Sequence, residues 1–195
     1  MGWFRDNLGT GDPSNHLRNG KRLAQEGQYA EAIAELKHAA QISPDSAEPH
    51  MIVGSVYIQS ERWPEACRAY FRALEIDPQS WQAYKQLGIV HDRQGNFVEA
   101  IKMFMKAIGL APKDAELRND LAQAYFNIGS YRETIKAARQ ALEIEPNNGR
   151  AHYLLGLTYI DHRDKSSALA EVANLQATGQ QDLAGILMDK IQRLL

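Results

Sequence analysis

The chain has 195 residues, of which 44% are hydrophobic and 24% are charged, a composition typical of a folded protein. Its 22 basic and 24 acidic residues nearly cancel, so charge favours neither nucleic acid nor anionic lipid as a partner. No stretch is long and apolar enough to span a bilayer, and the first residues lack the apolar core of a secretory signal. The single cysteine, Cys67, has no second cysteine for an internal disulfide, which favours a reducing compartment. We therefore expect a cytoplasmic protein without an integral membrane segment.

Four prolines reveal an internal repeat. They stand 34 residues apart, at Pro44, Pro78, Pro112 and Pro146. Each follows an apolar run with helical spacing, and a proline just past a helix end prevents the helix from continuing. The sequence therefore divides into blocks of 34 residues, at 13–46, 47–80, 81–114, 115–148 and from 149 onward.

Within each block, small and large residues recur at fixed positions. The eighth position carries a very small residue in every block: Gly20, Gly54, Gly88, Ala122 and Gly156. Other positions carry large residues, such as Leu36, Tyr70 and Phe104 at the twenty-fourth. A small residue lets a second helix approach closely, and large residues then fill the space beside it. The pattern predicts two tightly packed helices per block.

Turn and capping residues agree with this interpretation. Glycines at 27, 95 and 129 fall between the two apolar halves of their blocks, as expected for helix, tight turn, helix. A capping residue is expected just ahead of each first helix: Asp12 before Pro13, then Ser46, Ser80, Asp114 and Asn148.

These columns resemble the tetratricopeptide repeat over residues 13–178, most fully in the second to fourth blocks, for example at Gly54, Tyr57, Ala66, Tyr70 and Pro78. The resemblance implies an all-α, right-handed superhelical solenoid of antiparallel helix pairs. Four repeats are expected at 13–46, 47–80, 81–114 and 115–148, with a degenerate fifth at 149–178, after an amino-terminal extension at 1–12. The fifth block departs from the pattern because it lacks a closing proline, which leaves a count of four or five repeats.

Residues 179–195 carry a different pattern, an apolar stripe formed by Leu183, Ile186, Leu187, Ile191, Leu194 and Leu195. A repeat array exposes the apolar flank of its last unit unless another element covers it. We expect a capping helix here, and a dimerisation surface is the alternative.

None of the chemically reactive side chains forms a catalytic or metal-binding pattern. His16, His50 and His152 occupy the same position of three different blocks, and His38 falls in a column of polar outer-face residues. Residues a whole repeat apart are too distant to share a metal ion. Cys67 stands in a column otherwise filled by isoleucine and leucine, which predicts a buried, inert thiol. We expect no enzymatic activity, no cofactor and no metal.

The resemblance places function on the concave side, which the first helix of each repeat lines. There it implies a groove for a partner peptide or helix, with apolar anchors and polar groups that bond the peptide main chain. The expected groove residues are Arg18, Lys21, Met51, Ile52, Ser55, Lys85, Gln86, Ile89, Asn119, Gln123, Phe126, Asn127 and Tyr153. Leu157 and Ile160 occupy groove positions too, but we expect them to pack against the neighbouring repeat or the capping helix.

One family subtype can be tested directly, and one alternative function remains open. One family subtype binds acidic chaperone tails through a clamp of lysine, asparagine and arginine, and no frame of this sequence supplies that set. The chain is therefore expected to be a protein-binding scaffold of another kind. The alternative is a self-associating structural or assembly scaffold that uses its terminal surfaces, either the last helix or Trp3, Phe4 and Leu8.

Overall fold

Over residues 12–194, which the computed structural model describes, the chain forms eleven α-helices and no strand. It divides into two compact units, residues 1–90 and 91–195. The aromatic residues predicted to matter at the amino terminus, Trp3 and Phe4, lie outside the described range, as do Leu8 and Leu195. None of the described helices is long and apolar enough to cross a bilayer.

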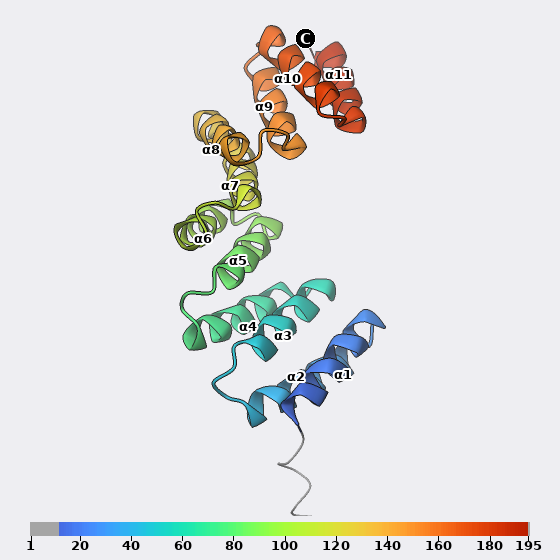
Figure 1. The fold of residues 1–195 in the computed structure, drawn as a ribbon, viewed down its shortest axis with the longest axis vertical. Helices are drawn as coiled ribbons and strands as arrows, with labels where there is room; N and C mark the ends of the chain where they lie inside the picture. The colour runs from blue at the N-terminus through green and yellow to red at the C-terminus, as the bar shows by residue number, and fades with distance from the viewer. Residues whose placement is uncertain (1–11, 195) are drawn as a thin grey trace, which may run out of the picture. The chain divides into compact units, whose positions relative to one another are not determined.

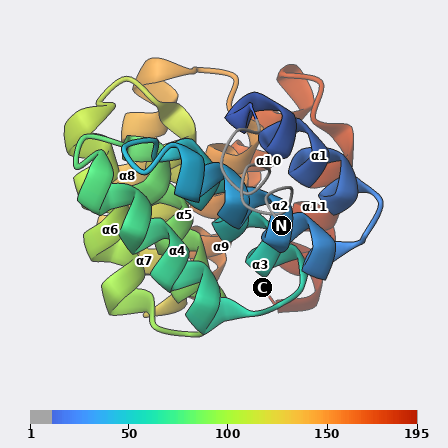
Figure 2. The same ribbon diagram turned by 90° about the horizontal axis from the view of Figure 1, so that it is seen from below.

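The first unit contains two antiparallel helix pairs and most of a fifth helix. Its helices are α1 (Pro13–Gln25), α2 (Tyr29–Ile42), α3 (Glu48–Gln59), α4 (Trp63–Ile76) and α5 (Trp81–Arg93), which reaches into the second unit. Helix α1 packs along α2, and α3 packs along α4 (Figures 1 and 2). Helix α3 also contacts α2 and, less extensively, α1.

The second unit continues the same arrangement. Its helices are α6 (Phe97–Leu110), α7 (Ala115–Asn127), α8 (Tyr131–Ile144), α9 (Gly149–Asp161), α10 (Lys165–Ala177) and α11 (Gln181–Leu194). Helix α7 pairs with α8 and α9 pairs with α10, while α7 and α9 also touch each other. The first helices α7 and α9 therefore share one side of this unit, which we call its first-helix side. In the first unit, the first-helix side is the face formed by α1, α3 and α5.

The turn inside each block has the same backbone conformation in all five blocks. Gly27, Gly95 and Gly129 have φ near +75°, and the corresponding residues of the second and fifth blocks, Glu61 and Arg163, have φ of 56° and 57°. In each turn the amide after this residue bonds the carbonyl five residues earlier, as from Gln28 N to Leu23 O at 2.9 Å. This hydrogen-bonding pattern ends a helix with a left-handed residue. The missing glycines in two blocks therefore do not abolish the turn.

The predicted caps form at four of the five first helices. The side chains of Asp12, Asp114 and Asn148 accept bonds from the amides of the first helical turn, and Ser80 Oγ accepts from Ala83 N at 3.3 Å. The prediction for Ser46 is wrong, since α3 begins after Ala47 without a side-chain cap. The amide that Ser46 would bond belongs to residue 49, which is a proline and has no N–H.

The small eighth position is the point of closest approach between helices. A Cβ atom added to Gly20 would lie 2.6 Å from Leu36 Cγ, and one added to Gly54 would lie 2.6 Å from Tyr70 Cζ. Leu36 and Tyr70 are themselves almost fully buried. The fourth block tolerates Ala122 at this position, and there the residue at the twenty-fourth position is the small Ala138 instead of a large one.

Helix α11 packs against both α9 and α10, in the way that α9 packs against α7 and α8. Its buried residues Ala184, Leu187 and Ile191 join a cluster with Ile160, Val172 and Leu175. Leu187 lies against Gly156, where the large second-helix residue of other blocks would be expected and the fifth block has only Val172. The predicted stripe is wrong at Ile186 and Leu194, which are 49% and 66% exposed. Residues 184, 187 and 191 follow helical spacing, and Ile186 points away from that face.

The close approach at Gly54 predicts a specific cost for one added methyl group. Alanine at position 54 overlaps the buried Tyr70 ring, and such overpacking costs about 1 to 3 kcal/mol, partly offset by a helix-propensity gain of up to about 1 kcal/mol. We expect Gly54→Ala to lower the free energy of unfolding by about 1 to 2 kcal/mol in denaturant titrations.

Gly109→Ala is the matched control, because Gly109 is also helical and a methyl group added there would have no other atom within 4 Å. It should raise the free energy of unfolding by about 0.5 to 1 kcal/mol. Equal shifts in the two variants would contradict a tight contact at Gly54.

Candidate functional site

The first-helix side of the first unit is basic at α1. A hollow of about 510 Å³ lies over this helix, and Leu17, Arg18, Lys21 and Arg22 line it. Lys21 Nζ lies 2.9 Å from Glu48 Oε1 of α3 and so ties the two first helices together. Arg18 and Lys21, both predicted groove residues, therefore border one hollow on this side.

The other predicted residues of this unit lie on α3 and α5. Met51, Ile52 and Ser55 are partly buried, as are Lys85, Gln86 and Ile89. Ser55 Oγ donates to the Ile52 carbonyl oxygen at 2.9 Å, so this hydroxyl already has an acceptor within its own helix. The apolar surface of Met51 and Ile52 is the part of α3 that remains for contact with a partner.

In the second unit, a row of amide side chains runs along α7. Gln123 Nε2 donates to Asn127 Oδ1 at 2.9 Å, and Asn127 Nδ2 donates to Asp92 Oδ1 at 3.0 Å. Asn127 is exposed and Gln123 is half-buried. These bonds hold the two amides in a defined orientation at the surface.

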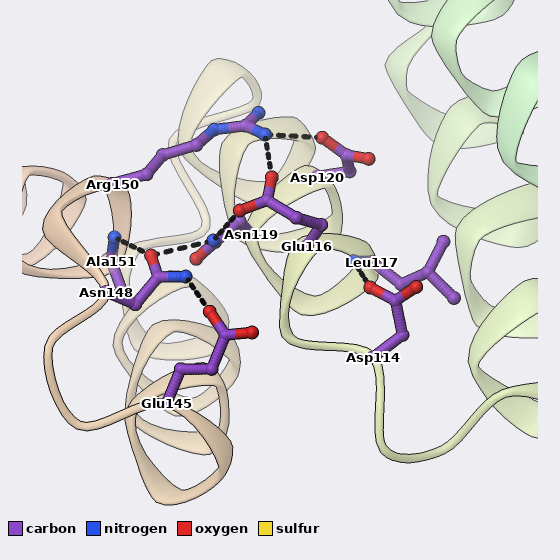
Figure 3. Close-up of polar contacts among 9 residues, drawn as sticks. All are labelled: Asp114, Glu116, Leu117, Asn119, Asp120, Glu145, Asn148, Arg150 and Ala151. Carbon is purple, nitrogen blue, oxygen red and sulfur yellow. Dashed lines mark hydrogen bonds and ion pairs between the residues drawn. The ribbon is translucent and has the colours of Figure 1, made fainter.

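The sequence predicts Asn119 to be a groove residue, but its side chain is fully buried. Its Nδ2 donates to Asn148 Oδ1 at 2.9 Å and to Glu116 Oε1 at 3.3 Å (Figure 3). Asn148 Oδ1 also accepts from Ala151 N at 3.0 Å and thereby caps α9. Asn119 therefore joins α7 to the start of α9 and is not available to a ligand.

Arg150 is a surface residue outside the predicted groove set. Its Nη1 lies 2.7 Å from Asp120 Oδ1 and 3.3 Å from Glu116 Oε2, across the contact between α9 and α7 (Figure 3). Arg150 is the second residue of its block. The family resemblance counts this position among those that line the groove, so the position of Arg150 in the repeat could have predicted it as a surface residue on this side. The ion pair partly neutralises the acidic surface of α7.

Phe126 and Tyr153 are both half-buried and partly engaged inside the unit. The Phe126 ring lies 5.9 Å from the Tyr131 ring, which in turn lies edge-on to His162 at 5.1 Å. Tyr153 packs against the cluster beneath α11, and burial raises the pKa of its hydroxyl. Leu157 also packs there and Ile160 is part of the cluster, which confirms the expectation of a packing role for these two residues.

Two histidines pair with glutamates, and Cys67 is partly buried. His16 Nδ1 lies 2.7 Å from Glu35 Oε2, and His152 Nδ1 lies 2.7 Å from Glu171 Oε2. Cys67 is half-buried, not fully buried as predicted, and burial raises the pKa of its thiol. Within residues 12–194, no group of three or more acidic, histidine or cysteine side chains is placed to hold a metal ion.

The Asn119 contact predicts that Asn148 does more than cap its helix. Loss of a cap alone costs about 1 kcal/mol, and a buried amide left without its partner costs about 1 to 3 kcal/mol more. Asn148→Ala should therefore lower the free energy of unfolding by about 2 to 4 kcal/mol. Asp114→Ala removes the equivalent cap of α7, so it should cost only about 1 kcal/mol, and equal losses in chemical denaturation would contradict the role of Asn119.

Comparison with known proteins agrees with this architecture. Family models of the tetratricopeptide repeat match residues 23–88, 81–114 and 119–182. No curated protein sequence matches the chain significantly.

Several solved structures share the fold at low sequence identity. MamA from Desulfovibrio magneticus RS-1, from its residue 41 to the end, is 22% identical, with a TM-score of 0.78 over 88% of this chain and 98% of that one. Another MamA structure is 21% identical, with a TM-score of 0.76 over 84% of this chain and 95% of that one. YrrB, described as a tetratricopeptide-repeat protein with an unusual peptide-binding site, is 21% identical, with a TM-score of 0.74 over 91% and 92% of the two chains.

The repeat matches cover most of the chain, and the helix pairs, turns and small-residue contacts follow the pattern of that family. The chain belongs to the tetratricopeptide-repeat family, which points to a protein-interaction module.

Proposed function

We propose that the chain is a scaffold that holds a peptide segment or helix of a partner protein on its first-helix side. The observation that carries this proposal is the ordered amide row of Gln123 and Asn127 on α7, held in place by Asp92. The proposed contact residues are the predicted groove residues without Asn119: Arg18, Lys21, Met51, Ile52, Ser55, Lys85, Gln86, Ile89, Gln123, Phe126, Asn127 and Tyr153.

The amide row has the chemistry needed to bond a peptide main chain. A side-chain amide carries two N–H donors and a carbonyl oxygen with two acceptor positions. The bonds within the row use one donor and one acceptor position of Asn127. The remaining donor and acceptor suit the N–H and C=O groups of an extended segment, because each main-chain residue offers one of each.

Partly exposed apolar side chains on the same helices supply anchors beside these polar groups. Phe126 stands next to Asn127 on α7, and Met51 and Ile52 stand on α3. A few apolar anchors account for most of the affinity of a typical interface, while the polar contacts fix the orientation of the partner. The basic hollow over α1 adds a place for acidic side chains of the partner.

The self-association alternative receives less support from α11. The buried residues Leu187 and Ile191 of this helix are already used within the second unit. Ile186 and Leu194 are the large apolar residues of α11 that remain exposed. YrrB, a structure of similar fold, is described by its peptide-binding site, which also favours a peptide partner for this chain.

The proposal predicts that partner capture depends on the amide row. Affinity capture with Gln123→Ala/Asn127→Ala should recover about tenfold less of a direct partner than the wild-type chain recovers, because the loss of such contacts costs about 1 to 3 kcal/mol. Glu143→Ala, an exposed change on α8, is the matched control and should leave recovery unchanged.

Quantitative mass spectrometry of the captured proteins measures the effect. If the double variant and the wild-type chain recover the same partners in the same amounts, the first-helix side is not the binding surface.

A further inference from the structure

Two hollows lie on the opposite face, between successive second helices, at the same register in each unit. One lies between α2 and α4, has a volume of about 280 Å³, and is floored by Val53 and Tyr57 of α3. The other lies between α6 and α8, has a volume of about 430 Å³, and is floored by Leu121 and Tyr125 of α7. Val53 and Leu121 occupy one position of the repeat, and Tyr57 and Tyr125 occupy another.

A single position of the repeat distinguishes the blocks with these hollows from the two end blocks. The twenty-third residue is Ala69 in the second block and Ala137 in the fourth, and each alanine lines its hollow. In the first and fifth blocks the same residue is glutamate, and its carboxylate lies 2.7 Å from the histidine at the fourth position. A histidine–glutamate pair thus occupies the slot in the end blocks, whereas alanine leaves it open.

Most of the charged residues that line the two hollows are cations. Arg118, Arg132 and Lys136 surround the larger hollow, with Glu133 as its one acidic lining residue. Lys37, Arg68 and Arg72 line the smaller hollow, with Glu65. Glu65 is bonded to Arg62, and Arg72 is paired with Glu75. Burial and the charge of Arg72 lower the pKa of His50 in this hollow. The net charge of the lining is therefore positive in both cases, and it attracts carboxylates.

The larger hollow also offers an apolar surface beside its cations. Met105 stands at its edge with 55% of its surface exposed, and Leu121 and Ala137 form part of its floor and wall. Arg118 Nη2 donates to the Pro112 carbonyl oxygen at 2.6 Å, but its buried Nε finds no acceptor among the described residues. An apolar side chain flanked by carboxylates complements this combination of groups.

We propose that each of these hollows is a second docking site within its own unit, for an acidic partner segment that inserts an apolar side chain between neighbouring second helices. These sites are distinct from the first-helix side, because they lie between second helices. Because the two hollows share one register of the repeat, the same kind of segment suits either of them.

The test uses a random peptide library displayed on phage and selected on the full-length chain. Each selected peptide is then measured by fluorescence polarisation against the wild-type chain and against Ala69→Glu/Ala137→Glu. Glutamate at these positions reproduces the first and fifth blocks, since it can pair with His50 in one hollow and Arg118 in the other. We expect a class of peptides rich in aspartate or glutamate beside leucine, phenylalanine or methionine, and we expect filling the hollows to weaken their binding about tenfold or more.

Two further variants show which surface binds the peptides and whether a loss of binding results only from misfolding. Arg132→Glu/Lys136→Glu changes only exposed residues and should weaken the same acidic peptides, whereas Gln123→Ala/Asn127→Ala should not. The proposal is overturned if no selected class loses affinity in the filled or charge-reversed variants, or if the class that does so is not acidic. A dimer in sedimentation velocity that the filled variant abolishes would also overturn it, because a second copy would then be the occupant.

Discussion

The close approach of helices at the eighth position of the repeat is the contact on which the rest of the structure depends. Leu36 lies against Gly20, Tyr70 against Gly54, and Leu187 against Gly156. A side chain at any of these glycines would separate the helices, because interiors are packed too densely to absorb even one methyl group without strain. At Gly156 the large residue comes from α11, because Leu187 fills the space that the smaller Val172 of the fifth block leaves. The contact therefore needs a large side chain at this place, but not one from a particular helix.

This packing fixes which side chains face outward, and therefore what each face can bind. On the first-helix side of the second unit it orients an amide row along α7, beside the ion pairs of Arg150. On the opposite face it leaves a slot between the fourth and twenty-third positions of each block. A histidine–glutamate pair fills that slot in the end blocks, and alanine opens it in the second and fourth. Small changes at one repeat position thus alter the surface without altering the helix packing that supports it.

The periodic features of the fold could be predicted from the sequence, because the same physical constraint recurs every 34 residues. Helix ends before the prolines, turns at Gly27, Gly95 and Gly129, and the small eighth position are of this kind. Features that depend on a neighbour in space could not be predicted in the same way. The loss of the Ser46 cap depends on Pro49, and the left-handed turns at Glu61 and Arg163 persist because the surrounding helix pair imposes them.

The candidate site was only partly predictable for a related reason. The position of a residue in the repeat predicts the face on which it lies. It does not predict whether a polar side chain already bonds a partner inside the protein. Asn119 stands in a groove position and yet is buried against Asn148, while Arg150 and Asp92 contribute to the surface through contacts across helices. The hollows on the opposite face become visible only when Ala69 and Ala137 are compared with the glutamates of the end blocks.

Partner binding on the first-helix side is the central claim, and site-specific photo-crosslinking tests it most directly. A benzophenone amino acid at Ile128, the residue next to Asn127, is compared with the same group at Glu143 on α8, since both positions are exposed. Irradiation should join a discrete partner polypeptide to position 128 and not to position 143. Crosslinking of the same partner at 143 alone, or equally at both positions, would contradict the claim.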